Sequence, residues 1–111
     1  MVEPEGISNY RLWLEAEVHV SRKYLPGKIR QRIKKLIEHL VEQPRPSMSR
    51  ILVTEGLVVP TQIEIRRLRL ENWRIIYAIN DTEKWVWVLA IRQRPPYHYE
   101  DLTELASLLS E

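Results

Sequence analysis

The sequence predicts a single α+β domain, in which helices pack on one face of a twisted, mainly antiparallel sheet. Three observations support this prediction. Apolar side chains between Ile29 and Val41 recur at helical spacing and form one stripe, which indicates a long amphipathic helix. Residues 85–91 are apolar at every position, which is typical of an inner strand covered on both faces. The length of 111 residues allows one hydrophobic core and no second domain, so we expect one domain over residues 1–111.

The first half of the chain predicts one strand and two helices. Residues 10–14 alternate weakly and indicate a strand, and residues 15–24 indicate a short helix. Pro26 and Gly27 then interrupt the chain before the long helix. That helix ends near residues 43–47, because two prolines there cannot continue it. We expect residues 1–7 to form an N-terminal tail.

The second half predicts three strands and a last helix. The strands cover residues 62–70, 73–79 and 85–91, with a hairpin loop at 80–83, and the C-terminal helix lies within residues 100–111. Ile63 and Ile65 have the opposite parity to Leu68 and Leu70, so one regular strand cannot point all four to one face. We therefore expect a β-bulge near residues 66–67. The predicted element order is β-α-α-β-β-β-α.

Composition limits the class of protein. The chain has no cysteine, which excludes disulfides and a thiolate nucleophile and suits a reducing cytosol, so we expect a cytoplasmic protein. Neither a membrane-spanning run nor a hydrophobic signal segment occurs, so we expect no membrane partner. The formal charge of only +2 hides a strong segregation of charge. Basic residues concentrate in residues 22–35 and in a second group of six arginines: Arg66, Arg67, Arg69, Arg74, Arg92 and Arg94. Acidic residues concentrate near both ends of the chain. We therefore expect an anionic partner.

Most catalytic motifs are missing. The histidines and aspartates lack metal-ligand spacing, so we predict no metal site. Three scattered glycines cannot form a phosphate-binding loop, and no serine lies in a nucleophile motif. We expect no small-molecule cofactor. The arginines are the remaining candidates.

The predicted meander gathers arginines at one end of the sheet. Arg69 and Arg74 flank one turn, and Arg92 and Arg94 end the last strand on the same side. Like charges brought together cost stability, so this cluster predicts an anionic ligand. The aromatic group 97–99 follows directly, and rings beside arginines suit unpaired nucleobases. The alternative is a solvated basic edge with tyrosines that merely pack against the last helix.

Two segments together resemble the RelE/ParE toxin superfamily. Residues 67–77 read RLRLENWRIIY, and after a short hairpin residues 86–94 read VWVLAIRQR. The family pattern is R-x-R-x-G-x-[YW]-R, two hydrophobic residues and Y, then a hydrophobic strand that ends in a basic run and a Tyr. Glu71 stands where the family often has glycine. The resemblance covers residues 9–99 and implies a compact RelE-like domain.

The resemblance implies the toxin of a type II toxin–antitoxin system. RelE-like members enter the ribosomal A site and cut mRNA there without a metal, so the implied activity is that of an mRNA endoribonuclease that inhibits translation. By matched position, Arg67 and Arg69 would hold and activate the RNA backbone, and Arg74 would stabilise charge on the scissile phosphate. Arg94 matches the arginine after the last strand. The aromatic residue that acts on the 2′-hydroxyl proton falls among three candidates: Tyr97, His98 and Tyr99.

The resemblance is also compatible with two other functions, and it implies three partners. Alternatives to the nuclease are a ParE-like inhibitor of DNA gyrase and a catalytically degenerate binding module on the same fold. The implied partners are a cognate antitoxin, mRNA and the ribosome. Further basic residues are interpreted as RNA-binding: Lys28, Arg32, Lys35, Arg66 and Arg92.

Overall fold

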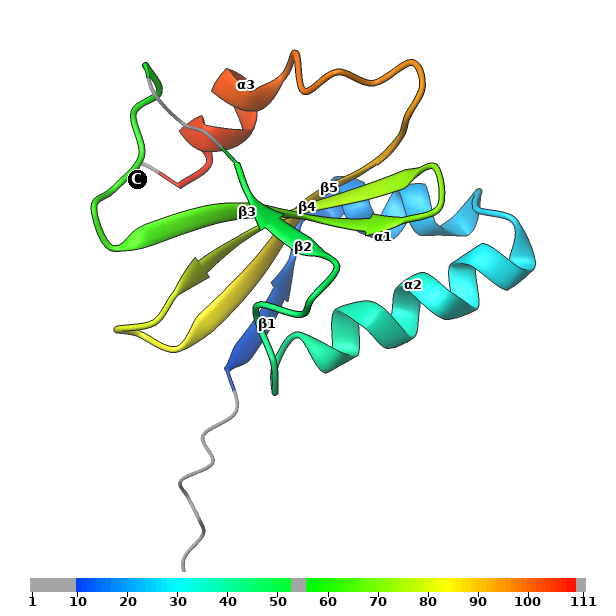
Figure 1. Cartoon of the computed structure of the whole chain (residues 1–111), viewed down its shortest axis with the longest axis horizontal. Helices are drawn as coiled ribbons and strands as arrows, with labels where there is room; N and C mark the ends of the chain where they lie inside the picture. Colours follow the sequence, from blue (N-terminus) through cyan, green and yellow to red (C-terminus); the bar gives the residue numbers. More distant parts are fainter. Residues whose placement is uncertain (1–9, 53–55, 110–111) are drawn as a thin grey trace, which may run out of the picture.

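The structure is a computed structural model that describes residues 10–52 and 56–109 (Figure 1). The expected N-terminal tail therefore lies outside the described residues. The helices and strands follow one another as β1 (Arg11–Leu14), α1 (Ala16–Lys23), α2 (Gly27–His39), β2 (Ser49–Ile51), β3 (Ile63–Leu70), β4 (Trp73–Asn80), β5 (Trp85–Gln93) and α3 (Leu102–Ser107). The predicted α+β class is confirmed.

The strands form one sheet in the order β1-β5-β4-β3-β2. β1 pairs in parallel with β5, and the remaining pairs are antiparallel. The three long strands make the predicted meander. β2 was not predicted: it is a three-residue edge strand paired to β3, so the described part of the chain holds five strands rather than four.

Helices cover both faces of the sheet, so the expectation that they all pack on one face is wrong. α1 and α2 lie on one side, and α3 lies on the other (Figure 1). The first core joins Ile33 and Ile37 of α2 to Leu68 of β3. The second joins Leu105 of α3 to Ile65, from the opposite face of the same strand. Because there is a core on each side of the sheet, apolar residues at both odd and even positions of β3 can be buried while the strand stays regular.

The predicted β-bulge near Arg66 and Arg67 is absent from the described strand. β3 pairs with β4 in continuous register from Ile63 to Leu70. The register shift lies instead between β4 and β5, where Ile76 pairs with Ala90 and Tyr77 with Val88. Because β3 is regular, Arg66 and Arg67 point to opposite faces of the sheet.

The turn between β3 and β4 brings two strand ends together. Glu71 has a φ of 52°, in the left-handed region that glycine adopts most easily. The family's glycine at this position therefore has a backbone reason, and this chain adopts the conformation with a glutamate. Among the described residues, no helix is long and apolar enough to cross a membrane.

Candidate nucleic-acid interface

Five arginines lie on the sheet face that α3 partly covers. Arg67 and Arg69 alternate with Leu68 and Leu70, whose side chains pack against α1 and α2, so the arginines point the other way. Strand register then aligns the rest: Arg74 lies between Arg69 and Arg92, and Arg50 of β2 lies opposite Arg67. We call this set the arginine face: Arg50, Arg67, Arg69, Arg74 and Arg92.

One member of the arginine face is neutralised by acids. Arg92 donates to Asp101 at 2.9 Å and lies 3.5 Å from Glu17 of α1. Burial lowers the pKa of Arg92, but the hydrogen bond that it donates to Asp101 and the negative charge of Glu17 more than offset this and raise the pKa. The residue therefore ties β5 to α1 and to the start of α3.

The other four members have no ion pair within residues 10–52 and 56–109. Burial lowers the pKa of Arg67, and three neighbouring guanidiniums lower it further. Tyr99 acts in the opposite direction. A half-buried cation surrounded mainly by other cations is destabilising, because nothing in the described chain compensates its charge.

Arg74 is the most buried of these arginines, at 8% exposed. Its Nη1 donates at 3.0 Å to the backbone carbonyls of Glu71 and Trp73, which fixes the guanidinium beside the turn. Its Nε is buried and has no hydrogen-bond partner. An orphaned donor on a buried cation is costly and points to a ligand that completes the site.

The structure separates the aromatic candidates. Tyr97 is buried and its hydroxyl donates to Asp101 at 2.5 Å; burial and this bond raise its pKa well above the usual range. His98 is exposed. Tyr99 has a buried hydroxyl with no hydrogen-bond partner, and it lies close enough to Arg67 to influence its pKa. Both tyrosines lie near the arginine face, since the Arg92 guanidinium carbon is 5.8 Å from the Tyr97 ring centroid, but of the two hydroxyls that of Tyr99 is the one left without a partner.

Arg94 joins the same region from the tail that follows β5. Its guanidinium carbon lies 5.5 Å from the ring centroid of Tyr99, a cation–π distance. The Tyr99 ring in turn packs edge-on against Tyr97, with centroids 4.8 Å apart. The residue after β5 and the last aromatic thus meet, as the sequence order predicts.

Four basic residues predicted to bind RNA do not belong to the arginine face. Arg66 points to the α2 side, where it pairs with Glu64. Lys28, Arg32 and Lys35 lie on α2, and Arg32 pairs with Glu71 at 2.5 Å. An open groove of about 490 Å³ connects Arg32 and Lys35 to Arg69 across the edge of the sheet; its remaining lining is Leu36, Met48, Leu70 and Glu71.

Sequence reasoning missed Arg50 and the two acids that pair with Arg92. Arg50 lies in the short strand β2, which carries no periodic pattern. Asp101 and Glu17 are far from β5 in sequence, so only the packing of α1 and of the tail reveals the pairing. The one available signal was the run of apolar residues after Arg50, which is compatible with an edge strand.

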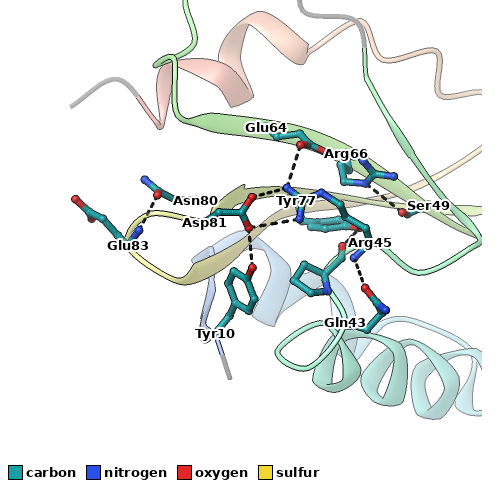
Figure 2. A network of polar contacts seen from close by, with 11 residues as sticks. Tyr10, Gln43, Arg45, Ser49, Glu64, Arg66, Tyr77, Asn80, Asp81 and Glu83 are labelled. Atoms are coloured by element: carbon teal, nitrogen blue, oxygen red, sulfur yellow. Dashed lines mark hydrogen bonds and ion pairs between the residues drawn. The ribbon is translucent and has the colours of Figure 1, made fainter. Parts of the chain in front are cut away.

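On the opposite face, a polar network centred on Arg45 uses the same residue types for a different purpose (Figure 2). Arg45 donates to Asp81 at 2.8 Å and to Glu64 at 3.1 Å. Asp81 also accepts a bond from the Tyr10 hydroxyl at 2.7 Å, and Glu64 accepts one from Arg66. This network joins β1, the loop after α2, β3 and the β4–β5 hairpin. The described residues contain no group of three or more acids and histidines that could hold a metal ion.

The comparison with protein families identifies the class. Residues 15–95 match the family model described as the ParE toxin of the type II toxin–antitoxin system parDE. The chain therefore belongs to this family, within the RelE/ParE toxin superfamily, and is the toxin component of a type II toxin–antitoxin system. No curated protein matches it significantly.

Solved structures share the fold at low identity. An archaeal RelE in the RelE–RelB complex from Pyrococcus horikoshii OT3 is 22% identical, with a TM-score of 0.69 over 80% of this chain and 99% of that chain. The toxin–antitoxin complex RelBE2 from Mycobacterium tuberculosis contains a chain with 18% identity and a TM-score of 0.61, over 78% of this chain and 99% of that one. The isolated E. coli RelE toxin is 19% identical, with a TM-score of 0.55 over 89% and 97%.

Proposed function

We propose that this toxin is an endoribonuclease that cleaves mRNA in the ribosomal A site without a metal. The observation that supports this most is the arginine face, where four guanidiniums have no ion pair in the described chain and one of them, Arg67, lies near Tyr99, whose hydroxyl has no partner. RNA supplies what such a site lacks: phosphates for the cations, and unpaired bases for the tyrosine rings.

Cleavage would proceed by attack of the RNA's own 2′-oxygen on the adjacent phosphate, which forms a 2′,3′-cyclic phosphate while the bond to the 5′-oxygen of the next nucleotide breaks. The 2′-hydroxyl gives up its proton, and the leaving 5′-oxygen takes one from water. The transition state carries extra negative charge on the phosphorane oxygens, and preorganised cations stabilise it. Arg74 is held by two backbone carbonyls and has no ion pair in the described chain, so it is the best-positioned cation to stabilise a phosphate oxygen. Arg67 and Arg69 would hold the backbone on either side.

The proton of the 2′-hydroxyl needs an acceptor. The Tyr97 hydroxyl already donates to Asp101, whereas the Tyr99 hydroxyl has no partner and Tyr99 lies near Arg67. We therefore assign the proton-handling role to Tyr99 and a positioning role to Tyr97, against which the Tyr99 ring packs. A tyrosine accepts a proton only in its phenolate form, and the Arg94 guanidinium near the Tyr99 ring would stabilise that form.

A cognate antitoxin is part of the proposal. Two of the structures with this fold are complexes of a RelE-type toxin with its antitoxin. A short acidic chain that covers the arginine face would relieve its charge repulsion and block access of RNA at the same time.

Inhibition of DNA gyrase is the second candidate, and the family match favours it, because the matching model describes ParE. Such an inhibitor acts by binding a protein and has no need of a phosphate-binding arginine face. The unpartnered buried atoms Arg74 Nε and Tyr99 Oη therefore weigh toward the nuclease.

One experiment separates these functions. The purified protein is incubated with mRNA, with and without ribosomes, and in parallel with DNA gyrase and relaxed plasmid. The nuclease proposal predicts mRNA cuts only when ribosomes are present, and normal supercoiling. Blocked supercoiling with intact mRNA would assign the gyrase function, and no effect in either assay would assign a binding module without catalysis.

A further inference from the structure

A second basic surface lies at the corner where α1 ends and α2 begins. A hollow of about 260 Å³ opens there, and its lining consists entirely of basic side chains. We call it the basic corner: His19, Arg22, Lys23 and Arg30. Three of its four residues come from the basic segment 22–35, and all four lie on helices that cover the face opposite α3 (Figure 1).

The cations of the basic corner are uncompensated. Within the described ranges, neither Arg22 nor Lys23 nor Arg30 forms an ion pair. Further along α2 the situation differs, because Arg32 pairs with Glu71 and Lys34 with Glu38. Ion pairs on this helix therefore occur at Arg32 and Lys34, whereas Lys28, Arg30 and Lys35 have none in the described chain.

Helix chemistry explains only part of this arrangement. Arg22 and Lys23 lie in the last turn of α1, where the helix dipole favours cations. Arg30 lies near the start of α2, whose first turn has no acid, and there the dipole disfavours a positive charge. The two helix ends thus bring cations together at a position where local stability does not require them.

We propose that the basic corner binds backbone phosphates of base-paired RNA, as a contact separate from the arginine face. This inference rests on the proposed function, since it gives the toxin a second hold on a structured RNA such as the ribosome provides. No tyrosine or tryptophan lines the hollow, unlike the arginine face with its Tyr99. Apart from the His19 imidazole the lining offers no ring for stacking, so the phosphates that a duplex presents on its outside suit this site better than unpaired bases.

The test uses a labelled RNA hairpin with a stem of about 16 base pairs, a length that spans two successive minor grooves. Binding is measured by fluorescence anisotropy at several salt concentrations with the full chain. Every protein also carries Arg67→Gln and Arg69→Gln, which removes most of the contribution from the arginine face. The corner variant adds Lys23→Gln and Arg30→Gln.

The matched control adds Arg11→Gln and Lys34→Gln instead. It removes one arginine and one lysine, both exposed, so its net charge equals that of the corner variant. The proposal predicts about tenfold weaker hairpin binding at low salt for the corner variant, and a salt slope smaller by about 2. The control should bind within about twofold of its parent. Equal weakening in both variants would overturn the proposal, because only net charge would matter.

Two further arms complete the design. If inorganic pyrophosphate saturates the corner and the hairpin does not compete for it, the ligand is a small phosphate compound and the RNA assignment is overturned. If the double variant does not fold, Lys23→Gln alone should still weaken hairpin binding about threefold, and unchanged binding contradicts the proposal. This assay contains no ribosome and measures no cleavage, so a failure of the proposed nuclease leaves its result independent.

Discussion

Arg66 and Arg67 are neighbours in β3, yet they serve opposite purposes. Arg66 faces α2 and is paired with Glu64 and with the Ser49 hydroxyl, within the Arg45 network. Arg67 faces α3 and has mainly other cations around it. The same side chain, one position apart, is thus saturated on one face and unsatisfied on the other. Charge without a partner inside the chain, rather than the number of arginines, therefore marks the surface that we propose binds RNA.

Tyr97 and Tyr99 differ in the same way, and substitution of Tyr99 should have the largest effect on mRNA cleavage. Tyr99→Phe removes the unpartnered hydroxyl and should reduce ribosome-dependent mRNA cleavage by about 100-fold, the usual contribution of a proton-transfer group. Tyr97→Phe removes a hydroxyl already bonded to Asp101, and cleavage should fall less than fivefold, about the limit for an indirect effect. Cleavage rates are read from primer extension. Equal losses in the two variants would show that Tyr99 has no special role.

On the α2 side of the sheet, where the polar groups have partners, substitutions should change stability rather than activity. The buried Tyr77 hydroxyl donates to the Pro44 carbonyl at 2.7 Å and anchors the loop after α2. Tyr77→Phe leaves that carbonyl without a partner and should lower the free energy of unfolding by about 1–2 kcal/mol, as measured by urea denaturation. Cleavage per folded molecule should stay unchanged, and a selective loss of activity would mean that the two faces are coupled.

Acid should weaken the Arg45 network and leave the arginine face unaffected. Hydrogen bonds from Arg45 and Tyr10 lower the pKa of Asp81, and those from Arg45 and Arg66 outweigh burial and lower that of Glu64. A folded-state pKa below the unfolded value contributes stability above the unfolded pKa.

The contribution is therefore complete above about pH 5 and is lost as the pH falls below about 4. Arg45→Gln should flatten this part of the stability profile, whereas Arg67→Gln should leave it unchanged. Chemical denaturation between pH 3 and pH 7 measures the effect, and identical profiles for Arg45→Gln and the unmodified protein would contradict it.

Anions that bind the arginine face should stabilise the folded protein by a small amount. Pyrophosphate that binds the arginine face raises the melting temperature by about 2–4 °C when it is well above its Kd, because it binds only the folded state. Arg67→Gln should reduce this shift, and Arg66→Gln should preserve it. Thermal melts at constant ionic strength test this, since an equal shift in both variants would indicate a nonspecific salt effect.

Sequence periodicity predicted the elements that are long and regular. The stripe between Ile29 and Val41 became α2, and the fully apolar run 85–91 became β5. The same run already implied cover on both faces, but placing that cover required the path of the tail to α3. β2 escaped prediction because three residues at an edge carry no period.

The sequence predicts that arginines gather at one end of the sheet, but it does not predict which of them share a face. Convergence of Arg69, Arg74 and Arg92 follows from meander topology alone, and the register confirms it. Which arginines share a face depends on parity, and the expected bulge in β3 would have placed Arg66 and Arg67 wrongly. The choice of Tyr99 over Tyr97 depends on Asp101, whose contact arises only from packing of the tail.

The Arg66/Arg67 pair allows the most direct test of whether the arginine face carries the proposed cleavage activity. Both substitutions to glutamine remove one guanidinium from adjacent positions of one strand, and each variant is assayed for mRNA cleavage on programmed ribosomes. We expect Arg67→Gln to lower the rate about 100-fold while the folded protein stays at least as stable as before, because a half-buried charge without an ion pair is removed. Arg66→Gln should cleave at nearly the full rate and unfold at lower urea. Full activity of Arg67→Gln, or an equal loss in Arg66→Gln, would contradict the claim that the unsatisfied face carries the function.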